Sequence, residues 1–273
     1  MTLLTRVAAR VSSTLGRENR LIRALRPSYE RLLDVASGRR GVEWPVNGEP
    51  FRIAPEMRRV VAQQTEPELW EFLRHSVHEG EQALDVGSFL GVYAIQICRW
   101  GGPRSRVICF EPTPSIVKVL HRHLALNDAA DRVSVVAKAL GDEPGFLDLH
   151  EHSDPYRNAI GVTDPAGRHM KTSRVPITTI DAVCEERKFV PTLIRMDVQG
   201  FEDSVLRGAR KTIAAGKGRL RIVLEVHPQL WGLHGMSPEK FDELLTDLGL
   251  RAVPLIVGAP RYEPDGHVLL QYI

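Results

Sequence analysis

The chain of 273 residues contains only three cysteines, Cys98, Cys109 and Cys184, and they stand far apart. Without paired or closely spaced cysteines, a disulfide framework and a cysteine-based zinc site are not expected. No apolar run approaches the roughly 18 residues that a membrane-spanning helix needs, and the N-terminus lacks the apolar core of a signal peptide. We therefore expect a cytoplasmic protein.

The chain also lacks an excess of one charge, because 36 Lys and Arg stand against 34 Asp and Glu. Aromatic residues make up only 6% of the sequence, and no segment resembles a base-flipping motif. Both observations argue against nucleic acid as a substrate or partner. Hydrophobic residues at 43% and charged residues at 26% are the proportions of a folded globular protein.

Residues 1–40 differ from the rest, since they carry nine Arg and only three acidic residues. Their apolar residues recur at helical spacing, which predicts short amphipathic helices. These helices could cap the following domain or lie on an anionic membrane surface, and both interpretations stay open. The Asn47-Gly48 pair predicts a tight hairpin, and residues 66–78 predict a helix. We expect an N-terminal helical and β-hairpin extension over residues 1–79 and one domain over residues 80–273.

From residue 82 onward, apolar stretches of strand length alternate with helical periodicity. This pattern predicts an α/β fold with a mostly parallel sheet and helices on both faces. The candidate strands of this sheet are 82–86, 106–110, 133–137, 193–197, 220–226, 250–256 and 267–273.

The long segment 141–191 contains two further candidate strands, 146–150 and 174–178, with a polar loop between them. A loop of this size in a compact domain is typically a lid or a binding loop. Its polar side chains suit a ligand rich in hydroxyl groups. They are His152, Asp154, Tyr156, Arg157, Asn158 and His169.

A glycine turn follows the first of these strands, with Asp85, Gly87, Ser88 and Gly91 in the order D-x-G-S-x-x-G. Glycine is needed where the backbone turns sharply and approaches a ligand. The spacing is not the G-x-G-x-x-G of dinucleotide folds. Glu111 ends the next strand, 20 residues after Gly91, where a carboxylate can accept both hydroxyls of a ribose. The two motifs together predict a ligand of the adenosine type.

Asp197, Glu225 and His227 end the fourth and fifth candidate strands, so we expect them at the ligand crevice. His227 is the first candidate for a general base, because the ordinary pKa of histidine, about 6.5, lies near working pH. Asp197 could instead be the base, a substrate anchor or a helix N-cap, and Glu225 could orient His227 or contact the substrate. The three groups could also hold Mg²⁺, but their spacing is not diagnostic and we assign no metal ligand.

A third motif, residues 193–202, reads Leu-Ile-Arg-Met-Asp-Val-Gln-Gly-Phe-Glu. Together with the glycine turn, Phe110-Glu111-Pro112 and the run from Leu224 to Pro228, it resembles the FkbM-type methyltransferases. These are S-adenosylmethionine enzymes of the class I Rossmann-like fold. The resemblance extends from about residue 43 to the C-terminus. It implies a seven-stranded sheet with one antiparallel strand, and methylation of a hydroxyl on a sugar, glycoside or secondary metabolite.

The resemblance also implies roles for single residues, with the methionine end of the cofactor at the glycine turn and its ribose at Glu111. The implied cofactor-binding residues are Asp85, Gly87, Ser88, Gly91, Glu111, Ala139, Leu140, Asp142 and Asp197, with the segment 138–142 at the adenine. Phe89 and Gln199 depart from the family pattern. An NAD-dependent oxidoreductase, and a catalytically inactive module that binds S-adenosylmethionine or a membrane surface, therefore stay as alternatives.

Overall fold

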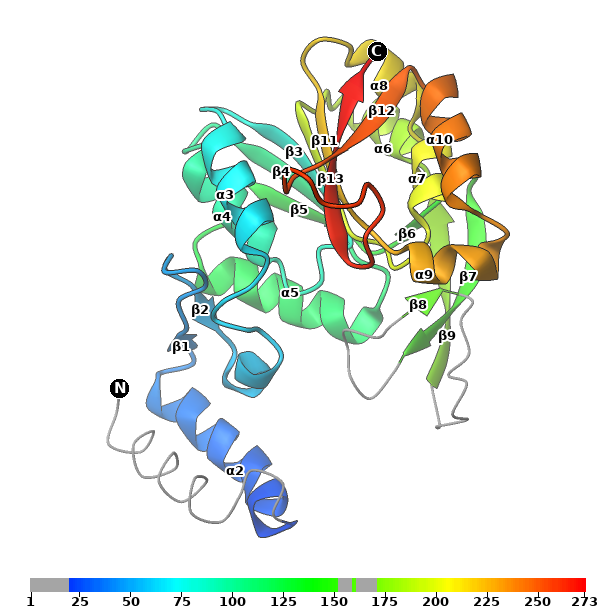
Figure 1. Ribbon diagram of the computed structural model, residues 1–273. Helices are drawn as coiled ribbons and strands as arrows, with labels where there is room; N and C mark the ends of the chain where they lie inside the picture. Colours follow the sequence, from blue (N-terminus) through cyan, green and yellow to red (C-terminus); the bar gives the residue numbers. More distant parts are fainter. Residues whose placement is uncertain (1–19, 152–158, 161–170) are drawn as a thin grey trace. The chain divides into compact units, whose positions relative to one another are not determined.

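The computed structural model describes residues 20–151, 159–160 and 171–273 (Figure 1). The chain forms two compact units, Met1–Gln63 and Gln64–Ile273. Helix α3 (Pro67–Ser76) belongs to the second unit, where the ring of Trp70 packs on Tyr93 and Trp100 of helix α4 (Val92–Trp100). The two compact units divide after Gln63, and the domain boundary expected between residues 79 and 80 stays a prediction.

The first unit contains helix α2 (Arg20–Ala36), strands β1 (Val42–Glu43) and β2 (Arg52–Ile53), and the 3-10 helix η1 (Pro55–Arg59). The predicted hairpin is confirmed, because β1 and β2 pair antiparallel and close on a turn in which Asn47 and Gly48 have φ of 47° and 81°. The helical segment expected before α2 lies outside the described residues, and a membrane contact of residues 1–40 stays a prediction. In the part of the chain that is described, no helix is long and apolar enough to cross a membrane.

The second unit is built on a seven-stranded sheet in the order β12-β13-β11-β10-β3-β4-β5 (Figure 1). Strand β13 runs antiparallel to both neighbours, and the remaining pairings are parallel. The expected α/β Rossmann-like sheet with one antiparallel strand is thus confirmed. The strands are β3 (Gln82–Val86), β4 (Arg106–Phe110), β5 (Val133–Val136), β10 (Leu193–Met196), β11 (Arg221–Val226), β12 (Leu250–Pro254) and β13 (Gly266–Tyr272).

Helices cover both faces of this sheet. Because successive strand residues point to opposite faces, one face presents apolar residues such as Leu84, Ile194 and Leu224, which share a core cluster with α6 to α10. On the other face, α4 packs on β3, β4 and β5, and α5 packs on β5. The helices after α4 are α5 (Pro114–Leu126), α6 (Ile180–Arg187), α7 (Glu202–Arg207), α8 (Arg210–Ala215), α9 (Pro228–Trp231) and α10 (Pro238–Asp247), with the 3-10 helix η3 (Gly232–His234) after α9.

The long segment after β5 forms a second sheet in the order β6-β9-β7-β8. Strands β7 (Gly145–Glu151) and β9 (Lys171–Thr178) pair antiparallel, which confirms the two candidate strands of this segment. Strands β6 (Ala139–Leu140) and β8 (Ala159–Ile160) are short. The polar side chains expected in the loop all lie outside the described residues: His152, Asp154, Tyr156, Arg157, Asn158 and His169.

The face of the main sheet nearer to α4 carries ionisable side chains where a covered sheet is usually apolar. The register pairs Arg195 of β10 with Asp85 of β3, and Glu225 of β11 with His267 of β13. We call these four residues the polar row. Tyr93 of α4 lies over the row, with its ring centroid 4.5 Å from the guanidinium carbon of Arg195.

The turn after β3 touches the turn after β10, and this contact requires glycine at position 87. Gly87 has φ of +75°, and a Cβ built on it would lie 1.8 Å from the carbonyl oxygen of Asp197. The backbone N–H of Asp197 in turn donates to the carbonyl of Val86 at 2.9 Å. The two loops that carry the predicted site residues are therefore locked together by their backbones.

Replacing Gly87 by alanine should destabilise the protein far more than its backbone angle alone explains. Gly218 offers a matched control, because it has φ of +84° and open space around its added Cβ. We expect Gly218→Ala to cost about 1–2 kcal/mol, the strain of a left-handed alanine. Gly87→Ala should cost more than about 4 kcal/mol, because a backbone atom must move as well. Urea unfolding measures both losses, and similar losses in the two variants would contradict the close approach.

Candidate active site

The glycine turn after β3 is held by its own hydrogen bonds. The backbone N–H groups of Gly87 and Ser88 both donate to the carbonyl of Phe110 at 3.0 Å, and the hydroxyl of Ser88 donates to the carbonyl of Asp85 at 2.5 Å. Phe89, one of the two departures from the family pattern, takes a left-handed φ of 47°. The predicted turn is therefore present, and its backbone is shaped before any ligand binds.

Glu111 lies buried at the edge of this turn, as expected for a residue that ends β4. Its carboxylate accepts the backbone N–H of Phe89 at 3.1 Å and that of Thr113 at 2.8 Å. Burial raises the pKa of Glu111 against the effect of these two donors. The two amides fix the direction of the carboxylate, and its contact with a ribose stays a prediction.

The segment expected at the adenine contains both buried and exposed side chains. The side chain of Leu140 is buried in the core cluster of the main sheet, and that of Ala139 is buried in a small cluster with Leu149 and Val175. Asp142 is exposed. Asp142 exchanges hydrogen bonds with the hydroxyl of Ser204 on α7, at 3.2 and 3.3 Å. The role of this segment at the adenine stays a prediction.

His227 stands directly after β11 and is held by a buried carboxylate. Its Nδ1 lies 2.7 Å from Oε1 of Glu202, the first residue of α7. Glu202 is fully buried and also accepts the indole N–H of Trp231 at 2.8 Å and the backbone N–H of Gly200 at 3.0 Å. Nδ1 is therefore the donor toward Glu202, and Nε2 is the ring nitrogen that faces the other side chains of the site.

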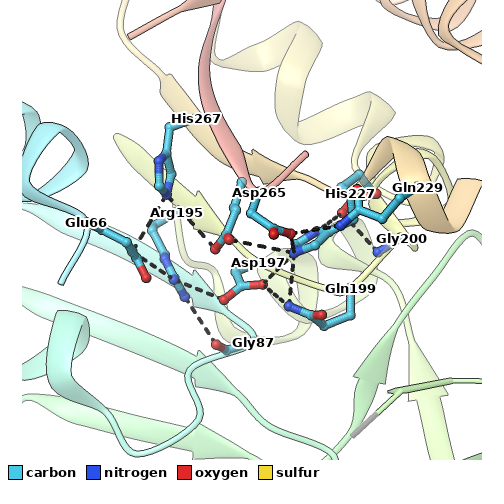
Figure 2. A network of polar contacts seen from close by, with 12 residues as sticks. Glu66, Gly87, Arg195, Asp197, Gln199, Gly200, His227, Gln229, Asp265 and His267 are labelled. Carbon is cyan, nitrogen blue, oxygen red and sulfur yellow. Dashed lines mark hydrogen bonds and ion pairs between the residues drawn. The ribbon is translucent and has the colours of Figure 1, made fainter. Parts of the chain in front are cut away.

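The other ring nitrogen of His227 faces three carboxylates (Figure 2). Nε2 lies 3.7 Å from Oδ1 of Asp197, 3.7 Å from Oε1 of Glu225 and 3.8 Å from Oδ1 of Asp265. The side-chain amide of Gln199 lies 2.9 Å from the same nitrogen and donates to Asp197 at 3.0 Å. The structure thus brings the three predicted catalytic residues together and adds Asp265 from the turn before β13.

The pKa of His227 differs from the ordinary histidine value that was assumed from the sequence. Burial favours the neutral ring, but the hydrogen bond to Glu202 and the negative charge of Asp197 outweigh it and raise the pKa of His227 to about 9. Burial and the neighbouring charges of Asp197 and Glu66 also raise the pKa of Glu225. A histidine with a pKa near 6.5 was expected, and the surrounding carboxylates are the reason for the difference.

Arg195 is the cation of this site, and sequence reasoning gave it no role. Its side chain is 5% exposed and lies 3.2 Å from Oδ2 of Asp197, 3.5 Å from Oδ1 of Asp85 and 3.9 Å from Oε2 of Glu66. It also donates to the carbonyl of Gly87 at 3.2 Å. The signal in the sequence was a charged residue at a strand position that should be apolar.

Glu66 and His267 were also missed, because their helix and strand are far apart in the chain. Glu66 precedes α3 and accepts the hydroxyl of Tyr93 at 2.5 Å. Burial opposes ionisation of Glu66, but its contacts with His267, Arg195 and Tyr93 lower its pKa to about 2. Within the described residues, two groups could hold a metal ion: Asp197, Glu225 and His227, and Glu66, Glu225 and His267.

Removing the charge of Arg195 should destabilise the protein strongly, because it leaves buried carboxylates without a counter-charge. We expect Arg195→Met to lower the free energy of unfolding at pH 7 by about 3–5 kcal/mol. Arg261 is a matched control, since it pairs with Asp242 at 2.8 Å on the surface, and Arg261→Met should cost no more than about 1 kcal/mol. Denaturant titration gives both values, and equal losses would contradict the role of Arg195.

Comparisons with known proteins identify the family of the chain. The family model described as the methyltransferase FkbM domain matches residues 85–252, more than half of the chain. The methyltransferase sdnD of Sordaria araneosa is 25% identical, over 61% of this chain and 72% of that protein.

Several solved structures are also similar. Methyltransferase FkbM from Methylobacillus flagellatus KT is 18% identical with a TM-score of 0.47, over 70% of this chain and 43% of its own, so this chain spans less than half of that protein. Cofactor-bound Rv0187 from MTB is 17% identical with a TM-score of 0.48, over 100% of this chain and 98% of its own. The O-methyltransferase from Bacillus cereus in complex with SAH is 14% identical with a TM-score of 0.46, over 98% of this chain and 97% of its own. On the match of the family model, the chain belongs to the FkbM methyltransferase domain family.

Proposed function

We propose that this protein is an S-adenosylmethionine-dependent O-methyltransferase that acts on a hydroxyl of a sugar, glycoside or secondary metabolite. The observation that carries the proposal is the placement of His227, whose Nδ1 is held by Glu202 while Nε2 faces Asp197 and Glu225. Asp197 and His227 follow β10 and β11, and Glu225 lies near the end of β11, at the carboxyl ends of the strands where the glycine turn leaves β3. Membership of the family favours methyl transfer over the hydride transfer of an oxidoreductase.

The residues around the glycine turn suit this cofactor. Both carboxylate oxygens of Asp85 are buried and accept no hydrogen bond from the described residues, although Oδ1 forms an ion pair with Arg195 at 3.5 Å. A buried acceptor without a donor is costly, and the ammonium group of a bound amino acid moiety would supply donors. Gly87, Ser88, Gly91 and Asp197 would hold the methionine end, and Glu111 the ribose. Ala139, Leu140 and Asp142 would lie toward the adenine.

S-adenosylmethionine, when bound, supplies an electrophilic methyl group on a sulfonium. That methyl group would be transferred to the acceptor oxygen with S-adenosylhomocysteine as the other product, and the proton of the hydroxyl would have to be removed. In this site the proton passes to Nε2 of His227, and Glu202 stabilises the imidazolium through Nδ1. Asp197 and Glu225 favour the positive ring and can accept hydrogen bonds from neighbouring hydroxyls of the acceptor. Positioning and proton removal then act together.

Substitution of His227 tests this assignment. His227→Gln should lower kcat by about 10²-fold or more, because a general base contributes roughly 10²–10⁴-fold, with little change in the dissociation constant for S-adenosylmethionine. Glu111→Ala should instead weaken cofactor binding in calorimetric titration. His75→Gln is a control on an exposed histidine of α3. Transfer of labelled methyl to a panel of glycosides measures turnover, and a wild-type rate in His227→Gln would refute the base.

The raised pKa of His227 predicts the pH dependence. A base must be unprotonated, so kcat/KM should rise with pH through an apparent pKa of about 9. Glu202→Gln removes a charged hydrogen-bond partner worth about 1.5–3 kcal/mol, which should move that pKa down by about 1–2 units. Measurement of kcat/KM between pH 6 and pH 10 gives the apparent pKa of the wild type and of Glu202→Gln. A flat wild-type profile, or the same midpoint in Glu202→Gln, would contradict the mechanism.

A further inference from the structure

His267 is a buried histidine without an ordinary hydrogen bond. Its side chain is 2% exposed, and neither ring nitrogen has a hydrogen-bond partner among the described residues. Nε2 lies 3.6 Å from Oε2 of Glu66 and 4.0 Å from Oε2 of Glu225, and Nδ1 lies 3.4 Å from Oε1 of Glu68. These separations exceed the 2.7–3.2 Å of a normal N–H···O bond, so the ring lies among carboxylates at ion-pair distance without a hydrogen bond of normal length.

Glu225 lies between two histidines, also at distances longer than a normal hydrogen bond. Its Oε1 lies 3.7 Å from Nε2 of His227, and its Oε2 lies 4.0 Å from Nε2 of His267. The side chain is 13% exposed, and its neighbours Asp197 and Glu66 are also acidic. A desolvated carboxylate among like charges is stabilised by a proton or by a cation.

One oxygen of Glu66, one oxygen of Glu225 and one nitrogen of His267 lie within 4.8 Å of one another. Carboxylate oxygens and imidazole nitrogens bind transition-metal ions at about 2.0–2.2 Å, which places ligand atoms roughly 3–3.5 Å apart. The distances from Nε2 to the two carboxylates are close to that range. A small movement of the side chains would complete the geometry.

We propose that Glu66, Glu225 and His267 form a binding site for a divalent transition-metal ion of the Zn²⁺ class. An imidazole ligand with two carboxylates suits Zn²⁺ better than Mg²⁺, which prefers oxygen ligands alone. Glu68 stands behind the site, at 3.4 Å from Nδ1. It would accept the Nδ1 proton and leave Nε2 free for the metal, an arrangement that is usual for metal-bound histidines.

The neighbouring group of Asp197, Glu225 and His227 is a weaker candidate, because both ring nitrogens of its histidine already have partners, Glu202 at Nδ1 and Gln199 at Nε2. At the proposed site Oε2 of Glu66 also has a partner, the hydroxyl of Tyr93, but neither nitrogen of His267 has a hydrogen-bond partner among the described residues. The amide of Gln199 contacts both Nε2 of His227 and Oδ1 of Asp197, at 2.9 and 3.0 Å. Arg195 donates to the other oxygen of Asp197 at 3.2 Å. An ion there would have to displace these contacts, whereas one at His267 would supply the partner that the ring lacks.

An ion at this site would connect three elements of the second unit. Glu66 and Glu68 belong to the start of α3, Glu225 to β11 and His267 to β13. The ion would therefore stabilise the attachment of α3 to the sheet beside His227. This inference concerns metal binding alone and does not depend on methyl transfer.

The test is a titration of the full-length, chelator-treated protein with Zn²⁺, without S-adenosylmethionine or acceptor. Calorimetry should show one ion per chain, and Co²⁺ should give an absorption spectrum typical of nitrogen and oxygen ligands. His267→Gln and Glu66→Gln should each weaken Zn²⁺ binding at least 100-fold. Glu68→Gln, which leaves the ligands intact, should weaken it about 10–100-fold. Zn²⁺ should also raise the Tm of the wild-type protein and not that of His267→Gln.

Two control variants locate the ion. His227→Gln removes the histidine of the neighbouring group, and His75→Gln removes an exposed histidine of α3. Both should bind Zn²⁺ as the wild type does. Absence of binding, equal binding in His267→Gln and the wild type, or a loss confined to His227→Gln would each overturn the proposal. If His267→Gln does not fold by circular dichroism, the affinities of Glu66→Gln and Glu68→Gln decide the question.

Discussion

The buried guanidinium of Arg195 allows the ends of several elements to carry negative charge in one place. Burying a guanidinium is costly, and the cost is offset here by Asp85 of β3, Asp197 after β10 and Glu66 before α3. The ring of Tyr93 lies over the guanidinium and adds a cation–π contact. Because every one of these partners comes from a different segment, the ion pairs fix the relative positions of the segments that surround the proposed active site.

The excess of carboxylates around this cation determines the chemistry of His227. Glu202 holds Nδ1 and is itself held by Trp231 and the backbone of Gly200, so the ring cannot turn without breaking buried hydrogen bonds. The carboxylates at Nε2 favour the protonated ring, which makes His227 a strong base once its proton has left. The same excess leaves His267 among carboxylates, where a metal ion would balance the charge. The proton affinity of His227 and the proposed metal affinity at His267 would therefore have one electrostatic origin.

The sequence predicted what depends on local patterns. Alternating strand and helix periodicity located all seven strands of the main sheet, and the Asn47-Gly48 pair located the hairpin. Asp197, Glu225 and His227 were found because strand ends meet at one edge of a parallel sheet. Other partners depend on contacts between distant segments, and no local pattern marks them: Glu66, Asp265 and His267. Glu202 stands in the third motif, but its contact with His227 was not expected. The ordinary pKa assumed for histidine failed for the same reason, since its neighbours come from α7 and from the turns beside β10 and β13.

The protonation state of His227 in the free protein tests the central claim most directly. Selective ¹⁵N labelling of histidine, with assignment by comparison to His227→Gln, gives the chemical shifts of both ring nitrogens at pH 7.5. The account predicts that Nδ1 and Nε2 both carry protons, with the Nδ1 proton shifted strongly downfield by its hydrogen bond to the buried Glu202. A neutral ring at this pH, with an unprotonated Nδ1 or Nε2, would contradict the arrangement of charges from which the function is inferred.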